Sequence, residues 1–202
     1  MNDVVVYIVD DDDAVRSGIA LLLRSAGIAA RGYARADDFI GAYDPAVCGC
    51  LLLDVRLPGT SGLELQELLR ERGIHLPVIM ITGHADVPMA VRAMKHGAVD
   101  FLQKPFNEQI LLERVQQALT QDRQRRAQEQ DVRALQQRYA ELSPREREVM
   151  LNIVTGKANK VIAIDLGISE RTVEVHRRRV MEKMQAHSVA ALVQTAVSLG
   201  LR

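Results

Sequence analysis

The chain is poor in aromatic residues, which make up 3% of its 202 residues, and it has no tryptophan. Tyr139 is the only aromatic residue after Phe106. Proteins that hold RNA or single-stranded nucleic acids stack the bases on aromatic side chains. The composition therefore argues against such binding in the second half of the chain.

Long apolar runs are missing as well. No stretch of 18 apolar residues occurs, so we predict no transmembrane helix and no membrane partner. The N-terminal segment MNDVVVYIVDDDD is acidic and has no basic region, which argues against a signal peptide. We therefore expect a cytoplasmic protein.

Cysteine is limited to Cys48 and Cys50, in the segment VCGC. A pair with this spacing is compatible with redox chemistry or with half of a metal site. The chain has no further cysteine, and no histidine lies near the pair in the sequence. We therefore interpret both residues as small apolar residues at the start of a strand.

Basic and acidic residues balance, with 26 of each, but they are distributed unevenly. Residues 1–121 carry 11 basic and 16 acidic side chains, residues 122–140 carry five and three, and residues 141–202 carry ten and seven. An acidic first part and a basic last part indicate two modules with different partners.

A strand followed by a helix is indicated five times between residues 4 and 120. The patterns predict strands near 4–9, 28–33, 49–54, 77–82 and 98–102, and helices near 13–26, 36–43, 62–72, 86–96 and 107–120. This alternation predicts an α/β domain at residues 1–120, with a doubly wound parallel sheet and helices on both faces.

A helical linker is predicted at residues 121–141, because the segment up to residue 140 has no Gly or Pro and is rich in Gln, Arg and Ala. Upstream, Arg125 and Arg126 interrupt any apolar pattern. The 3-4-3 spacing of a coiled-coil seam occurs at Val132, Leu135, Tyr139 and Leu142. A solvated tether and a pairing helix are both compatible with this segment.

No strand pattern remains after residue 142, and we predict an all-α four-helix domain at residues 142–202. Capping residues and periodicity place the helix starts at Ser143, Lys160, Ser169 and Ser188. A short helix, a turn at Gly167 and a basic helix together predict a helix-turn-helix.

Polar residues follow the apolar runs of four predicted strands. They are Asp10, Asp11, Asp54, Thr82 and Lys104. Because the carboxyl ends of parallel strands meet at one edge of an open sheet, we expect these side chains to form one site. Three carboxylates, a hydroxyl and an ammonium group predict a site for a divalent cation and a phosphoryl group.

Four consecutive aspartates occupy positions 10–13, and their charges repel one another unless a cation neutralises them. Mg²⁺ prefers oxygen ligands and takes only one or two carboxylates. Asp12 and Asp13 lie at the start of a predicted helix, where negative charge is favoured. We therefore assign these two residues to helix capping and not to metal binding.

Asp54 ends a predicted strand, where its carboxylate is placed to attack phosphorus and form an acyl phosphate. Such a reaction needs charge neutralisation, which Lys104 and a cation supply, and Thr82 can donate a hydrogen bond to a phosphoryl oxygen. A free-standing phosphatase of the haloacid type is the alternative. It requires a second carboxylate two residues after the nucleophile, where this chain has Arg56.

The segments IVDDDD, LLLDVRLPGTSGLEL and VIMITGHADVPMAVRAMKHGAVDFLQKPF resemble the receiver domain of two-component response regulators, over about residues 3–120. The resemblance implies that Asp54 accepts a phosphoryl group from a sensor histidine kinase. It also implies that Asp11, Asp54 and the backbone carbonyl of Arg56 bind Mg²⁺ or Mn²⁺, with Asp10 assisting through water.

The segment LSPREREVMLNIVTGKANKVIAIDLGISERTVEVHRRRVMEKM resembles the LuxR-type helix-turn-helix domain, so the whole chain resembles a FixJ-type transcriptional regulator. The resemblance implies a transcription factor that acts on double-stranded promoter DNA with RNA polymerase, and that catalyses only its own phosphoryl transfer and slow self-dephosphorylation. It implies that the side chains of Thr82 and Phe101 change conformation when Asp54 is phosphorylated. It also implies that phosphorylation promotes a homodimer through residues 86–105.

The third helix of the predicted helix-turn-helix domain has two faces. The expected inward stripe consists of Val173, Val180 and Met184, and His176 borders it as a packed or phosphate-facing side chain. The outward face, with i, i+3, i+4 and i+7 spacing, consists of Arg171, Glu174, Val175 and Arg178. Side chains of these types can read guanine, cytosine and thymine in the major groove.

Contacts to DNA phosphates are expected from Lys160, the amides near Thr172, Arg177, Arg179 and Lys183. Such contacts set affinity and salt dependence, not sequence preference. Two alternatives remain open for this domain: a solvated charged helix face, and a surface that binds a partner protein.

Overall fold

The computed structural model describes residues 4–83 and 87–201. The chain divides into two compact units, Met1–Arg126 and Ala127–Arg202. Residue 86, where the predicted fourth helix and the predicted dimer region begin, lies outside the described residues, as do residues 1–3 and 202 at the ends of the predicted domains. Every helix within residues 4–83 and 87–201 is too short or too polar to span a lipid bilayer.

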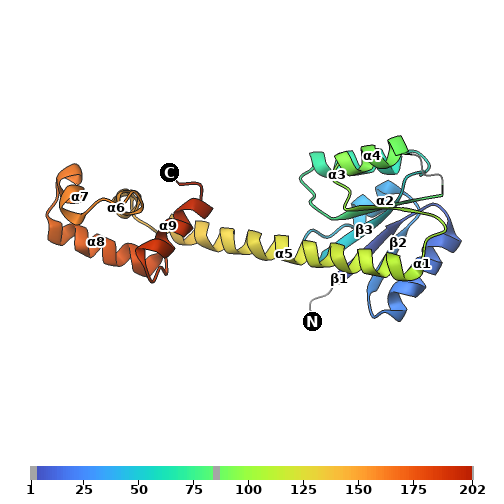
Figure 1. Ribbon diagram of the computed structural model, residues 1–202, viewed down its shortest axis with the longest axis horizontal. Coiled ribbons are helices and arrows are strands. Elements are labelled where there is room, and N and C mark those ends of the chain that lie inside the picture. The colour runs from blue at the N-terminus through green and yellow to red at the C-terminus, as the bar shows by residue number, and fades with distance from the viewer. Residues whose placement is uncertain (1–3, 84–86, 202) are drawn as a thin grey trace. The chain divides into compact units, whose positions relative to one another are not determined.

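The first unit contains a parallel sheet of five strands (Figure 1). The strand order is β2-β1-β3-β4-β5. The strands are β1 (Val4–Val9), β2 (Ala29–Tyr33), β3 (Cys48–Asp54), β4 (Val78–Thr82) and β5 (Asp100–Gln103). The order reverses between β1 and β3, and ligands of open α/β sheets bind at such a switch point.

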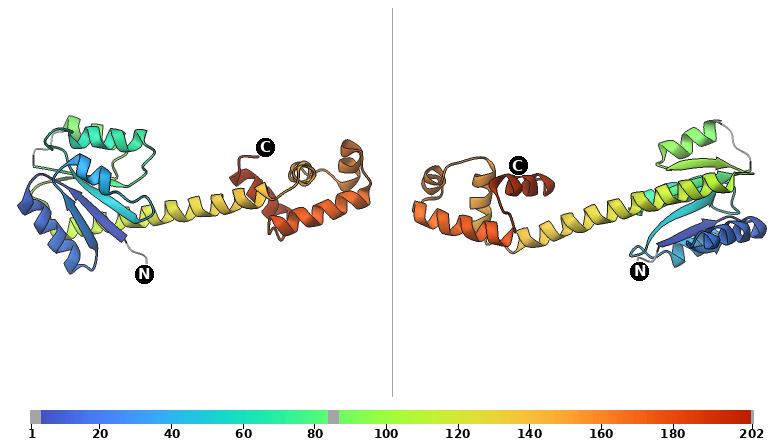
Figure 2. Two further views of the ribbon diagram at one scale, coloured as in Figure 1. Left: turned by 180° about the vertical axis from the view of Figure 1, so that it is seen from behind. Right: turned by 60° about the horizontal axis from the view of Figure 1, so that its bottom comes forward.

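Helices cover both faces of this sheet, so the predicted doubly wound fold is confirmed (Figures 1 and 2). They are α1 (Asp13–Ser25), α2 (Ala36–Ala42), α3 (Gly62–Glu71), α4 (Val87–Lys95) and α5 (Glu108–Ala140). The helix starts lie within two residues of the predicted positions. Helix α5 continues through the predicted linker, as its composition indicates.

Two apolar cores flank the sheet because successive side chains of a strand point to opposite faces. Toward α1 and α5 lie Val6, Ile8, Ile19, Leu23, Leu52, Ile79, Ile81, Leu111 and Val115. Toward α2, α3 and α4 lie Tyr7, Val9, Phe39, Leu51, Leu53, Leu65, Met80 and Ala93. The rings of Tyr7 and Phe39 meet edge to face, with 5.4 Å between their centroids.

The second unit contains helices and no strand among its described residues. Besides the end of α5, it contains α6 (Pro144–Val154), α7 (Asn159–Leu166), α8 (Glu170–Lys183) and α9 (Val189–Ser198). Its core includes Leu142, Val149, Met150, Ile153, Ile162, Val173, Val180, Met184 and Leu192. The predicted four-helix domain is therefore confirmed.

Serine residues are the N-caps of three of these helices, as their positions in the sequence predict. Ser143 and Glu146 form a reciprocal capping box at the start of α6. The hydroxyls of Ser169 and Ser188 accept backbone N–H groups at the starts of α8 and α9. Gly167, with φ of 65°, ends α7 and turns the chain toward α8.

The two cysteines are free and lie at the start of β3, Cys48 half-buried and Cys50 buried. Burial raises the pKa of both thiols above the ordinary value. A buried thiol with a raised pKa is a poor nucleophile, which agrees with their interpretation as small apolar residues.

Candidate functional site

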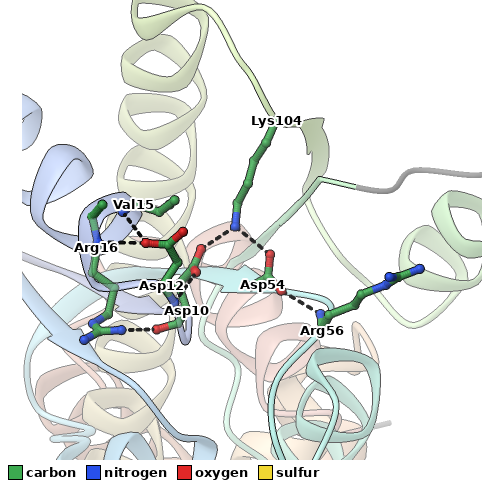
Figure 3. Close-up of polar contacts among 8 residues, drawn as sticks. Asp10, Asp12, Val15, Arg16, Asp54, Arg56 and Lys104 are labelled. Atoms are coloured by element: carbon green, nitrogen blue, oxygen red, sulfur yellow. Dashed lines mark hydrogen bonds and ion pairs between the residues drawn. The ribbon is translucent and has the colours of Figure 1, made fainter.

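Three side chains predicted to share a site meet at the carboxyl-terminal edge of the sheet (Figure 3). Lys104 Nζ lies 2.5 Å from Oδ2 of Asp10 and 2.7 Å from Oδ1 of Asp54. Asp10 is fully buried, Asp54 is 4% exposed, and Lys104 is mostly buried. One ammonium group therefore bridges two buried carboxylates that lie 94 and 50 residues away from it in the sequence.

Backbone contacts hold both carboxylates in place. Oδ1 of Asp10 accepts the N–H of Asp12 at 3.1 Å, and Oδ2 of Asp54 accepts the N–H of Arg56 at 2.7 Å. Helix α3 begins against the backbone of Asp54, because a Cβ atom at Gly62 would lie 2.1 Å from the Asp54 carbonyl oxygen. A glycine is therefore required at position 62 for this loop to close beside Asp54.

Strand register brings Thr82 and Lys104 to the same edge. Thr82 is fully buried at the end of β4 and is paired with Gln103. The N–H of Lys104 donates to the carbonyl oxygen of Thr82 at 2.8 Å, and the Lys104–Pro105 peptide bond is cis. Phe101, on β5, is half-buried against the core beneath α2, α3 and α4.

The other aspartates of the acidic run have different surroundings. Asp12 is the N-cap of α1, where its Oδ1 accepts the N–H groups of Ala14 and Val15 at 2.8 and 3.2 Å. Asp13 forms an ion pair with Arg16. The predicted capping by Asp12 is confirmed. Asp11 is exposed, and its predicted role in metal binding stays a prediction.

Burial and neighbouring charges shift the pKa values of Asp54 and Lys104. Burial raises the pKa of Asp54, and the charge of Asp10 adds to this effect, while hydrogen bonds from Lys104 and Arg56 oppose it. Burial alone would lower the pKa of Lys104, but its hydrogen bonds to Asp10 and Asp54 outweigh burial and raise it. The ammonium is thus firmly charged, whereas Asp54 is incompletely compensated because one cation serves two carboxylates.

The donor set fits a hard divalent cation. Asp10 and Asp54 bring two negative charges against the one positive charge of Lys104, and Asp11, which follows Asp10 in the sequence, would offer a third to a divalent cation. In the parts of the chain that the structure describes, no group of three or more Asp, Glu, His or Cys side chains converges as a complete metal cage. Mg²⁺ does not need such a cage, because it takes one or two carboxylates and retains several waters.

The second candidate surface is helix α8. Val173, Val180 and Met184 are buried in the core of the second unit, which confirms the inward stripe. The other predicted face is exposed and comprises Arg171, Glu174, Val175 and Arg178. His176 is half-buried at the border between the faces. The geometry leaves four base-reading candidates on one accessible side of the helix.

The residues predicted to contact phosphates differ in their surroundings. Lys160 and Arg179 are exposed. The N–H of Thr172 donates to the Ser169 hydroxyl at 3.1 Å. Arg177 donates to Asn159 at 3.2 Å, and Lys183 pairs with buried Glu146 at 2.7 Å. Arg177 and Lys183 therefore also support the packing of α8 against α7 and α6.

Two charged contacts were missed by sequence reasoning. The first is the ion pair of Glu146, a residue of the α6 capping box, with Lys183. Asp122 is fully buried and pairs with Arg126 at 2.6 Å. The i, i+4 spacing of Asp122 and Arg126 is the only sequence signal for the second contact, and it is equally typical of exposed helical pairs.

Comparisons with known proteins bear on both surfaces. A family profile described as the response regulator receiver domain matches residues 6–116, which is more than half of the chain. A second profile, for bacterial regulatory proteins of the luxR family, matches residues 140–196. The chain belongs to the response regulator family.

Relatives resemble this response regulator over nearly its full length. It is 48% identical to transcriptional regulatory protein FixJ of Azorhizobium caulinodans, over 97% of this chain and 93% of the relative. It is 46% identical to nodulation protein W of Bradyrhizobium diazoefficiens, over 98% and 87%. These similarities, with the two profiles, identify a DNA-binding two-component response regulator.

Solved structures of similar proteins agree with this assignment. The response regulator StyR has a TM-score of 0.89 and 44% identity, with 96% of this chain and 98% of StyR covered. Full-length FixJ from B. japonicum has a TM-score of 0.59 and 41% identity, with 98% of both chains covered.

Proposed function

We propose that this response regulator accepts a phosphoryl group on Asp54 from a sensor histidine kinase and then binds promoter DNA more tightly to activate transcription. The observation that carries the proposal is the buried Asp54 carboxylate, which contacts the ammonium of Lys104 at the edge of the sheet. We assign phosphate acceptance to residues 1–120 and DNA binding to residues 142–202, joined by the linker 121–141.

The proposed reaction is a single phosphoryl transfer. A carboxylate oxygen of Asp54 forms a bond to phosphorus while the bond between phosphorus and the kinase histidine nitrogen breaks. The imidazole keeps that electron pair and takes up a proton, and an acyl phosphate remains on Asp54. Lys104 neutralises charge on the phosphoryl oxygens, and the Thr82 hydroxyl donates a hydrogen bond to one of them.

Asp11, Asp54 and the carbonyl oxygen of Arg56 are the proposed ligands of Mg²⁺ or Mn²⁺, and Asp10 is proposed to assist through water. When bound, the cation supplies the positive charge that Lys104 alone does not provide. The side chain two residues after Asp54 is the guanidinium of Arg56, which cannot act as a general acid. The acyl phosphate is therefore a stored signal that this chain hydrolyses slowly.

A phosphorylation-dependent homodimer through residues 86–105 is part of the proposal. Helix α4 presents exposed apolar side chains at Val87, Val91 and Met94, which are 76%, 46% and 47% exposed. They follow one another at spacings of four and three residues, so they share one helix face. We infer that Thr82 and Phe101 transmit phosphorylation to this face, and that a two-fold dimer then reads two half-sites.

The exposed face of α8 is proposed to enter the major groove. Arg171, Glu174, Val175 and Arg178 would contact base edges. Lys160, Thr172, Arg177, Arg179 and Lys183 would contact phosphates. RNA polymerase is the proposed partner at the promoter, and the proposed location is the cytoplasm.

An electrophoretic shift assay with Asp54→Asn tests the proposal. DNA fragments are first enriched from genomic DNA with the phosphorylated wild-type protein, and affinity is then measured before and after treatment with acetyl phosphate and Mg²⁺. We expect a gain of about 5–150-fold for the wild type and none for Asp54→Asn. The exposed Asp37→Asn variant is the control and should respond like the wild type. An undiminished gain in Asp54→Asn would refute the proposal.

A further inference from the structure

Asp122 is a fully buried carboxylate that the phosphoryl-transfer chemistry does not use. It lies on α5, beyond residue 116, where the match to the receiver family ends. The apolar residues that attach α5 to the sheet end at Leu119, and Asp122 is the last buried residue of the helix. The position is therefore the last buried point at which α5 contacts the first unit.

Three donors surround this carboxylate. Oδ2 accepts the N–H of Gly49 at 3.0 Å and the Nε–H of Arg126 at 2.6 Å, and Oδ1 accepts a guanidinium N–H of Arg125 at 2.5 Å. Burial would raise the pKa of Asp122, but these hydrogen bonds outweigh it and hold the pKa below the ordinary value. Asp122 is thus ionised and bound in place.

The contact with Gly49 follows from the register of the sheet. Alternate N–H groups of β3 point toward β4, and that of Leu51 donates to Pro77 at 2.9 Å. The N–H of Gly49 points to the same side as that of Leu51. Gly49 nevertheless lies beyond the N-terminal end of β4, because that strand begins only at Val78. The carboxylate of Asp122 accepts this N–H in place of a strand carbonyl.

Arg126 extends the contact to the loop before β3. Its Nη1 and Nη2 groups donate to the carbonyl oxygens of Pro45 and Val47, both at 2.7 Å, while Nε donates to Asp122. A planar guanidinium can satisfy three acceptors in fixed directions, which a lysine ammonium on a flexible stem cannot reproduce. We call Gly49, Asp122 and Arg126 the α5 clamp.

We propose that Asp122 and Arg126 are positioning residues, which fix the rotation of α5 about its own axis where the helix leaves the receiver. The response of DNA binding to phosphorylation depends on this rotation. The inference rests on the proposed function. Apolar contacts are non-directional, whereas these charged hydrogen bonds specify direction. Helix α5 continues from the clamp to Ala140, and Tyr139 near its end packs against the core of the second unit.

The test compares full-length Asp122→Asn and Arg126→Lys with Asp131→Asn and Arg133→Lys, which make the same changes at exposed positions of α5. Labelling by acetyl phosphate should stay within about twofold of wild type in all four, since the clamp lies away from the phosphoryl site. The ratio of DNA affinities with and without phosphorylation should fall at least fivefold in the clamp variants only. Hydrogen exchange of residues 45–50 and 119–126 should accelerate about tenfold in the same two variants.

Two results would overturn the proposed role of the α5 clamp. Faster exchange with an unchanged affinity ratio would mean that the clamp serves stability alone, and would overturn the inference. Loss of labelling in both clamp variants would overturn it as well, because Arg126→Lys keeps the charge beside Asp122. A wild-type protein without any affinity gain would instead refute the proposed function, which separates the two failures.

Discussion

At the scale of single residues, Lys104 is the cation that contacts both buried carboxylates of the site. Its ammonium touches two carboxylates that are almost completely removed from water. Burial and the nearby charge of Asp10 raise the pKa of Asp54, and Lys104 opposes both effects. A neutral side chain at position 104 would raise the pKa of Asp54 further and leave phosphoryl oxygens without their protein counter-charge.

We therefore expect Lys104→Ala to slow phosphorylation by about 100-fold, the scale of losing one preorganised electrostatic contact. Intact-mass spectrometry after incubation with acetyl phosphate and Mg²⁺ measures the rate. The control is Lys95→Ala, which removes an exposed lysine of α4 and should leave the rate unchanged. A Lys104→Ala rate within threefold of wild type would show that the bridge is dispensable.

At the scale of elements, Glu146 joins the start of α6 to the end of α8. Its carboxylate accepts the Lys183 ammonium at 2.7 Å and the N–H of Ser143 at 2.8 Å. The hydrogen bond from Lys183, with those from Ser143, lowers the pKa of Glu146 from 4.5 to about 2. A lowered pKa contributes stability that is present above the ordinary value and is lost as the pH falls through the folded value.

Glu146→Gln should lower the free energy of unfolding of the second unit by about 1.5–3 kcal/mol at neutral pH, the scale of a charged hydrogen bond. The difference from wild type should shrink as the pH falls from about 4.5 to about 2. Urea denaturation followed by circular dichroism measures both effects. Glu148→Gln, which alters an exposed pair with Arg145, should cost less than about 0.5 kcal/mol. A penalty independent of pH would contradict this account.

The exposed face of α8 allows base contacts and phosphate contacts to be separated. Arg178→Ala should cost about 1–3 kcal/mol on the preferred DNA and weaken the preference at one base position. Lys160→Ala should weaken binding to all sequences alike and reduce the salt slope by about one. Fluorescence anisotropy titrations at several salt concentrations distinguish the effects of these two variants. Lys157→Ala is the control, since the ammonium of Lys157 pairs with Asp165. Equal effects of Arg178→Ala on all sequences would remove it from base reading.

Local patterns explain why most elements were predictable. Apolar runs, capping serines and helix-ending glycines placed the helices and strands, and the rule of parallel strand ends brought Asp10, Asp54 and Lys104 together. Tertiary partners were not predictable in this way. Whether Lys183 meets a phosphate or Glu146, and whether Asp122 is exposed or buried, depends on how distant elements pack, and helix periodicity is the same in either case.

At the scale of the whole molecule, the described residues form separate cores in the two units. The first unit buries apolar side chains on both faces of its sheet, and the second buries its own between α6, α7, α8 and α9. Their boundary, after Arg126, lies within the predicted linker. Each unit therefore has apolar packing of its own.

Ile153→Ala should destabilise the second unit by about 2–4 kcal/mol, because the side chain is only 2% exposed and its removal leaves a cavity. Calorimetry of the full chain should show one thermal transition lowered and the other unchanged. The rate of phosphorylation by acetyl phosphate should match wild type. A single transition, lowered as a whole, would show that the two units unfold together.

The uneven placement of tyrosines gives the protein an internal optical label. Tyr7, Tyr33 and Tyr43 surround Phe39 in the first unit, whereas Tyr139 lies in the second with the Arg147 guanidinium 5.1 Å from its ring centroid. Because tryptophan is absent, near-ultraviolet absorption and fluorescence come mainly from these rings. Tyrosine spectroscopy of the unmodified chain therefore observes chiefly the first unit, and a Tyr139→Phe variant would confine the tyrosine signal to it.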